Sequence, residues 1–254
     1  MIWPFKRRRR HTRSSIFTRF YGLLRVFHWV FRLLLVLLIL DLFYVAANWP
    51  DWKKLSSGPI PKSNFIKSYS RDTKKAKHKG SPPLRWRRVA YNKIPAHVVR
   101  AAIVAEDSRF YQHDGFDLVA FREAMDYNLT EGRMAFGGST ISQQTVKNVF
   151  LTSSRDPLRK WHELLLTWGM EKNLKKRRIM EIYLNVAEFG TGIYGVQAAS
   201  QYYWHRSVDK LSLRQAAELA ACLPSPRKHN PETRTKSFLK RKEKIYYWLR
   251  QDPS

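Results

Sequence analysis

The sequence predicts a mainly α-helical fold, in which one membrane-spanning helix precedes a single helical domain. Three observations support this prediction. Residues 27–49 form an almost unbroken apolar run, and apolar residues recur at helical spacing from residue 89 onward. No alternating run of β-forming residues is long enough to build a sheet.

The composition excludes several classes of protein. With 254 residues, of which 44% are hydrophobic, the chain is too rich in core-forming side chains to be disordered. Its single cysteine, Cys222, excludes an internal disulfide framework and a cysteine-rich zinc site. The 47 Lys and Arg outnumber the 20 Asp and Glu, so the net charge is +27 and the protein should act near nucleic acid, an anionic membrane or a phosphate-bearing substrate.

The apolar run is best explained as a transmembrane helix that follows a basic tail over residues 1–26. A helix over residues 27–47 would be about 31 Å long, close to the thickness of the hydrocarbon core. Arg32 can reach the headgroups, whereas Asp41 would lie deep in the span at a cost of about 2.5–3.5 kcal/mol. The basic residues before Ser14 place the N-terminus in the cytoplasm and the chain after Pro50 outside it.

A cleaved signal peptide and a buried soluble helix are the alternatives for this run. No small-residue cleavage site follows it, which disfavours the signal peptide. Placement of the domain outside the cytoplasm also disfavours nucleic acid as the partner of the positive charge.

Two regions are expected after the span. Residues 50–88 are basic and rich in Pro, Ser and Gly, which is typical of a linker or a membrane-hugging stalk. Residues 89–250 are predicted to form the main domain. Its helices are expected over residues 96–110, 118–129, 140–151, 157–174, 176–184, 192–203, 212–223 and 235–250.

A first candidate site lies at Glu106, where an apolar helical stretch ends. On a helix that continues to Phe110, the side chains of Glu106, Phe110 and His113 would share one face. Apolar neighbours would desolvate the Glu106 carboxylate and raise its pKa, which suits a proton acceptor. The alternative is an exposed acidic helix end that His113 caps.

A second candidate site is a polar stripe after a glycine turn. Thr140 and Gln143 fit a capping box, and Thr140, Gln144 and Lys147 then recur at helical spacing. Such a stripe suits a sugar-phosphate ligand, because amides and hydroxyls bind sugar oxygens and lysine binds phosphate. A solvated helix face is the alternative. The G-x-S-x-G pattern of a serine hydrolase is absent.

A second carboxylate, Glu163, has cations around it in the sequence. Arg159 and Glu163 are four residues apart, so they form either a weak surface ion pair or a functional carboxylate in a cationic setting. Glu106, Asp107 and His113 lack the paired-histidine spacing of a metal site held by protein alone. A divalent ion that bridges a carboxylate and a substrate phosphate fits better.

In order, these segments resemble five motifs of the peptidoglycan glycosyltransferases, in particular their monofunctional single-pass membrane branch. The first motif, E-D-x-x-F-x-x-H-x-G, comprises Glu106, Asp107, Phe110, His113 and Gly115. The second, G-G-S-T-x-x-Q-Q-x-x-K-N, runs from Gly137 to Asn148. The third, R-K-x-x-E, comprises Arg159, Lys160 and Glu163. The fourth, K-x-x-I-x-E-x-Y-L-N, comprises Lys176, Ile179, Glu181, Tyr183, Leu184 and Asn185. The fifth, R-x-x-x-V-L, is matched loosely by Arg241 with Ile245 and Tyr246.

The resemblance implies a lysozyme-like fold with a small membrane-facing lobe over residues 116–136. Its apolar surface would come from Leu118, Val119, Phe121, Met125, Met134 and Phe136. The implied reaction is inverting transfer of a growing glycan strand from undecaprenyl pyrophosphate to the 4-hydroxyl of incoming lipid II, without transpeptidase activity. The implied catalytic carboxylates are Glu106, as general base, and Glu163. The residues implied to bind substrate are Asp107, Phe110, His113, Ser139, Thr140, Gln143, Gln144, Lys147, Asn148, Arg155, Arg159, Lys160, Glu181 and Asn185.

The resemblance also implies partners and a location. The expected partners are lipid II, the glycan strand, membrane lipid and proteins of cell-wall synthesis or division, with no nucleic acid. No organic cofactor is expected, and Mg²⁺ or Mn²⁺ near Glu163 would bridge the substrate pyrophosphate. The domain is expected to face the periplasm from the inner membrane. The alternatives are a lytic transglycosylase or muramidase that cleaves glycan, and a non-enzymatic membrane-tethered scaffold that binds polyanions.

Overall fold

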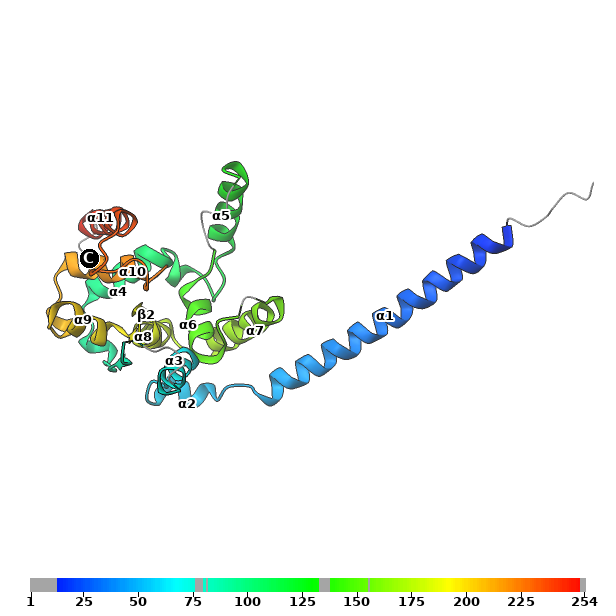
Figure 1. Cartoon of the computed structure of the whole chain (residues 1–254), viewed down its shortest axis with the longest axis horizontal. Coiled ribbons are helices and arrows are strands. Elements are labelled where there is room, and N and C mark those ends of the chain that lie inside the picture. The colour runs from blue at the N-terminus through cyan, green and yellow to red at the C-terminus, as the bar shows by residue number, and fades with distance from the viewer. Residues whose placement is uncertain (1–12, 76–79, 81, 133–137, 155, 252–254) are drawn as a thin grey trace, which may run out of the picture. The chain divides into compact units, whose positions relative to one another are not determined.

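The structure is a computed structural model that describes residues 13–75, 80, 82–132, 138–154 and 156–251 (Figure 1). The chain divides into two units, residues 1–50 and 51–254. In the first unit, helix α1 (Arg13–Ala47) contains a stretch, Tyr21–Ala47, that is long and apolar enough to cross a membrane. Its apolar side chains are exposed, as expected for a helix whose surroundings are lipid.

The second unit is mainly helical, as the sequence predicted. Its longer helices are α4 (Ala96–Glu106), α5 (Leu118–Thr130), α6 (Ile141–Phe150), α7 (Pro157–Asn173), α8 (Lys176–Val186), α9 (Val196–Trp204), α10 (Leu213–Cys222) and α11 (Lys236–Gln251). Helix α6 packs against α7 and α8, and α10 packs against α4 and α11. Tyr183 of α8 is among the largest fully buried side chains, so α8 lies at the centre of the core.

A short sheet, which the sequence did not predict, joins the core. Its strands are β1 (Arg85–Trp86), β2 (Glu188–Gly190) and β3 (Ile193–Tyr194), in the order β1-β3-β2. Strand β3 pairs parallel to β1 and antiparallel to β2. Strands this short show no alternating pattern. The helix expected from residue 192 begins at Val196, because Gly192 and Gly195 take positive φ angles of 75° and 82° in the turns that precede it.

The expected linker differs most from the structure. It contains α2 (Trp52–Ser57) and α3 (Asn64–Lys74), and the side chains of Trp52, Leu55 and Ile66 are buried in the core. The Arg178 guanidinium of α8 donates hydrogen bonds to the carbonyls of Leu55, at 2.9 Å, and Gly58. This stretch is therefore part of the folded unit. Residues 76–79 and 81 of the expected linker lie outside the described residues.

Three short 3₁₀ helices connect the larger elements of the described chain. They are η1 (Tyr91–Lys93), η2 (Phe110–Gln112) and η3 (Val208–Lys210). Helix α4 lies between η1 and η2, and η2 is followed by α5. The chain therefore leaves helix α4 at Glu106 and forms only a short turn before the next long helix.

Candidate active site

Helix α4 ends at Glu106, and the predicted continuation to Phe110 is wrong. The chain leaves the helix at Asp107 and re-enters a helical turn only at η2. Glu106, Phe110 and His113 therefore do not share a helix face. The physical reason is the Asp107 carboxylate, which accepts the backbone N–H of Ile141 at 2.9 Å and so ties the end of α4 to the start of α6.

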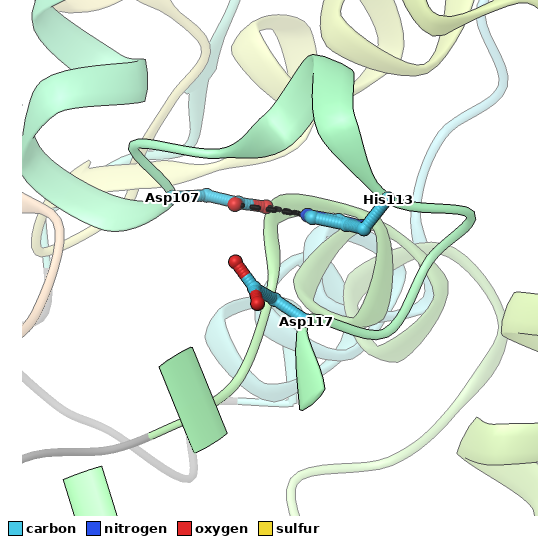
Figure 2. A group of neighbouring side chains, drawn as sticks. All are labelled: Asp107, His113 and Asp117. Atoms are coloured by element: carbon cyan, nitrogen blue, oxygen red, sulfur yellow. Dashed lines mark hydrogen bonds and ion pairs between the residues drawn. The ribbon is translucent and has the colours of Figure 1, made fainter. Parts of the chain in front are cut away.

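Asp107, His113 and Asp117 form a compact polar group (Figure 2). The Nδ1 atom of His113 lies 3.1 Å from the backbone N–H of Gly115. Because an N–H can only donate, Nδ1 accepts, so Nε2 carries the hydrogen and donates it to Asp107 Oδ1 at 3.0 Å. The Asp117 carboxylate accepts the N–H of Ala120 at 2.9 Å and pairs with Arg109 at 3.1 Å.

Oxygen and nitrogen atoms of this group lie within 4.8 Å of one another, a spacing that suits a metal ion. A metal would have to displace the Nε2 hydrogen of His113 and compete with the Arg109 guanidinium for Asp117. These donors therefore fit a hydrogen-bonded hub better than a metal centre. Its effect is to hold Asp107 and His113 in place beside the N-terminus of α6.

Glu106 is shielded from water and held at both carboxylate oxygens. Its side chain is 10% exposed. Oε1 accepts from the Arg241 guanidinium of α11 at 2.8 Å, and Oε2 accepts from the Gln144 amide of α6 at 2.9 Å. Burial raises the pKa of Glu106, and the hydrogen bond from Gln144 and the charges of Arg241 and Lys147 oppose that rise. The carboxylate is thus a stronger base than an exposed glutamate.

A cluster of cations surrounds Glu163 on α7. Its carboxylate accepts from Arg159 at 2.6 Å and from Lys160 at 2.5 Å. The Glu163 side chain is only 4% exposed, so the weak surface ion pair considered from the sequence is the wrong alternative. Arg155, which the sequence also placed here, lies outside the described residues.

Lys147 of α6 connects the two carboxylates electrostatically. Burial lowers the pKa of Lys147, and the neighbouring charges of Arg159 and Lys160 lower it further, whereas those of Glu163 and Glu106 raise it. Lys147 thus lies within electrostatic reach of both Glu106 and the Glu163 cluster. With both Glu163 oxygens bound by cations, the cluster fits an anion such as pyrophosphate, and these residues do not fit a divalent ion held at Glu163.

A cavity of about 390 Å³ opens beside Glu106, within the size range of small-ligand sites. Its walls come from the end of α4, from α5, and from the segment that enters α6, and they include Glu106, Asp117, Glu123, Tyr127, Ser139 and Thr140. Helix α5 also exposes Leu118, Val119, Phe121, Met125 and Leu129. Met134 and Phe136 lie outside the described residues.

Several predicted substrate-binding residues are committed to contacts within the protein. Gln143 closes the predicted capping box with Thr140, and Phe110 is fully buried with the Lys176 ammonium 4.6 Å above its ring. Glu181 accepts the N–H of Tyr91 at 2.9 Å, and Asn185 accepts that of Val89 at 2.8 Å. These contacts account for the four side chains without a substrate. Asn148 follows Lys147 on α6 and is half-buried.

Sequence reasoning missed two groups in the site. Arg241 stood only in the loosely matched fifth motif, and nothing in its spacing shows that α11 crosses the end of α4. Ser142 of α6 donates to Glu171, which also pairs with Lys176 at 2.8 Å. This network joins α6, α7 and the start of α8.

A shielded carboxylate with a raised pKa near a cluster of cations suits group transfer in which a hydroxyl is deprotonated beside a departing phosphate. The comparisons with known proteins agree. A family model described as Transglycosylase matches residues 76–249, so the chain belongs to the transglycosylase family.

Curated relatives carry the name biosynthetic peptidoglycan transglycosylase. The relative from Chromobacterium violaceum is 48% identical over 162 residues, which cover 64% of this chain and 71% of the relative. That from Methylobacillus flagellatus is 43% identical over 153 residues, or 60% of this chain and 67% of the relative. That from a Janthinobacterium species is 37% identical over 216 residues, or 85% of this chain and 90% of the relative.

Proposed function

We propose that this protein is a peptidoglycan glycosyltransferase that polymerises lipid II into glycan strands. The observation that carries the proposal is the buried carboxylate of Glu106, which lines a cavity and is bound at 2.9 Å by Gln144 of α6, the helix that also carries Lys147. Membership of the transglycosylase family and the names of the relatives support the same reaction.

Glu106 acts as the general base. It takes the proton from the 4-hydroxyl of the acceptor sugar, and the oxygen attacks the anomeric carbon of the donor strand. Burial favours this step because it raises the pKa of Glu106 toward the pH at which the enzyme works. Attack from the face opposite the leaving group inverts the configuration at the anomeric carbon.

Lys147, Arg159 and Lys160 stabilise the leaving group. As the bond between the anomeric carbon and the phosphate oxygen breaks, the electron pair leaves with undecaprenyl pyrophosphate, whose added charge these cations neutralise. Glu163 orients Arg159 and Lys160 through its ion pairs at 2.6 and 2.5 Å. In this scheme Gln144 and Arg241 position the base, and Ser139 and Asn148 are left to contact the sugars.

The membrane supplies a substrate that carries a lipid. Helix α1 would anchor the chain with its basic N-terminus in the cytoplasm. The exposed apolar side chains of α5, such as Leu118 and Leu129, would rest on the outer face of the bilayer next to the cavity at Glu106. A lipid-linked sugar could then enter the cavity from the membrane.

A polymerisation assay tests the proposal. Full-length protein in detergent is incubated with purified lipid II, and separately with finished sacculi. We expect polymer from lipid II, no soluble fragments from sacculi, and polymerisation by Glu106→Gln that is slower by at least about a hundredfold. Release of fragments from sacculi would instead show that the protein cleaves glycan. Polymer formation by Glu106→Gln at the wild-type rate would show that Glu106 is not the general base.

A further inference from the structure

A second and larger cavity lies at the other end of α6. The cavity at Glu106 touches Ser139 and Thr140, which precede this helix, whereas the second touches Leu151, Thr152 and Ser153, which follow it. Its volume is about 940 Å³. Helix α6 has 10 residues, so about 15 Å of helix separates the two cavities. We call the second cavity the α3 groove, because α3 forms one wall of it.

Part of the lining of the α3 groove is a fixed aromatic and polar surface. The Tyr69 hydroxyl donates to the carbonyl of Pro82 at 2.7 Å, and the Tyr69 ring packs edge-on against Tyr194 at 6.0 Å. Arg227 pairs with Glu188 at 2.9 Å beside them. Gly192 takes a φ of +75°, and a side chain there would collide with the Tyr69 ring, so the backbone accommodates this tyrosine closely.

The walls of the α3 groove add cations and hydroxyls. Lys67 and Arg71 are four residues apart on α3, so they project from one side of the helix, and both are exposed. Within the described chain, neither makes an ion pair with a carboxylate. Thr152 and Ser153, which follow α6, contribute hydroxyls to the lining. Aromatic rings, hydroxyls and unpaired cations together suit a carbohydrate that carries carboxylates.

We propose that the α3 groove binds the elongating glycan strand as it leaves the reaction centre, with Lys67 and Arg71 contacting the carboxylates of its stem peptides. This inference rests on the proposed function. The strand stays joined to the pyrophosphate at Lys147 while its older sugars must run away from Glu106. Lys147 lies one helical turn before Leu151 at the edge of the groove, as the bond from the Leu151 N–H to the Lys147 carbonyl at 3.2 Å shows.

Binding in the α3 groove would keep a strand at the site between additions. A second contact point raises the effective concentration of the strand end near Glu106, so more units are added before release. Helix α3 ends at Lys74, ahead of residue 76 where the family match begins, so this wall comes from outside the matched region.

Strand length provides the first test. Full-length wild type and Lys67→Glu/Arg71→Glu are compared on lipid II in detergent, with strands sized on gels. The matched control is Lys236→Glu/Lys240→Glu, which changes the same charge at the same spacing on exposed positions of α11. We expect the groove variant to make strands several-fold shorter at a nearly unchanged rate of initial coupling, and the control to make strands of wild-type length. Wild-type strand length in the groove variant would overturn the proposal.

Direct binding provides a test that does not depend on catalysis. Uncrosslinked peptidoglycan strands, with their stem peptides intact or removed by an amidase, are titrated onto the full-length wild type and both variants. We expect weaker binding of the peptide-free strands and of the groove variant, with the difference falling at high salt. Equal binding of both kinds of strand to the wild type and to both variants would overturn the proposal that the α3 groove binds the strand. A wild type that binds strands through Lys67 and Arg71 but makes no polymer would instead refute only the proposed function.

Discussion

Glu106 and Glu163 are both buried carboxylates, yet their surroundings differ. Glu106 faces a cavity and has one guanidinium and one neutral amide as partners, at 2.8 and 2.9 Å. Glu163 has Arg159 and Lys160 on its two oxygens, at 2.6 and 2.5 Å. Two cations compensate the charge of Glu163, whereas at Glu106 burial outweighs its partners and raises the pKa. This difference supports the proposed roles, which are proton transfer for Glu106 and the organisation of cations for Glu163.

The largest expected effect comes from removing the base. Glu106→Gln keeps the size of the side chain and an oxygen that Arg241 can donate to, but it abolishes proton uptake. We expect polymerisation of lipid II to fall by about 10²–10⁴-fold. Single-turnover assays on full-length protein measure the loss, and an unchanged thermal melt checks the fold. Activity within a few-fold of wild type would show that Glu106 is not the general base.

The next largest effect is expected at the cation cluster. Lys147→Met removes a charge within electrostatic reach of both carboxylates while keeping a long side chain. We expect about a 10²–10³-fold loss of kcat, as for other groups that stabilise charge in the transition state. Lys172→Met, at an exposed position of the adjacent helix α7, is the matched control. An equal loss of kcat in both variants would mean that the loss comes from the lower net positive charge of the domain. The position of Lys147 would then have no special role.

Local rules account for the features that the sequence predicted correctly. The capping box of Thr140 and Gln143 involves residues three apart, and the order of the helices follows from apolar spacing. The end of α4 was missed because its cause is distant: Asp107 accepts the N–H of Ile141, 34 residues away. Spacing alone gives no access to such contacts.

The contacts of the base show the same limit. Arg241 is 135 residues from Glu106 in the chain, and only the packing of α11 beside α4 brings them together. Composition misled in the expected linker, where Pro, Gly and Lys conceal the few apolar residues, such as Ile66, that fix α3 to the core. A short amphipathic helix buries too few residues to stand out in such a sequence.

A smaller effect, with a distinctive pH dependence, is expected from Arg241→Met. Glu106 must be unprotonated to accept a proton, so activity falls as the pH drops through its pKa, which burial places above the usual value of about 4.3. The Arg241 charge lowers that pKa, so its removal moves the acid limb of the rate profile to higher pH. We therefore expect the rate of the variant relative to that of wild type to fall progressively as the pH is lowered, because a smaller fraction of Glu106 is unprotonated.

The remainder of the profile gives a check on this interpretation. Lys147 must be protonated to bind pyrophosphate, and burial lowers its pKa, so activity also falls as the pH rises through a value below the usual 10.4 or so. Arg241→Met should leave this alkaline limb in place, and Arg241→Lys should restore part of the acid limb. A uniform loss at every pH would assign Arg241 a purely structural role.

The smallest effect is expected on membrane binding, which separates α5 from the rest of the second unit. Leu118 and Leu129 are 76% and 74% exposed on α5 next to the cavity at Glu106. In a chain that lacks residues 1–50, replacing both with Ser should weaken binding to anionic vesicles about fivefold, since their partial burial in lipid is worth about 1 kcal/mol. Tyr247→Ser/Trp248→Ser on α11 removes exposed aromatic side chains elsewhere and serves as the control. Equal losses of vesicle affinity in both variants would show that exposed apolar area in general, and not α5, holds the domain at the membrane. The lipid-linked sugar would then reach Glu106 by a path that does not pass α5.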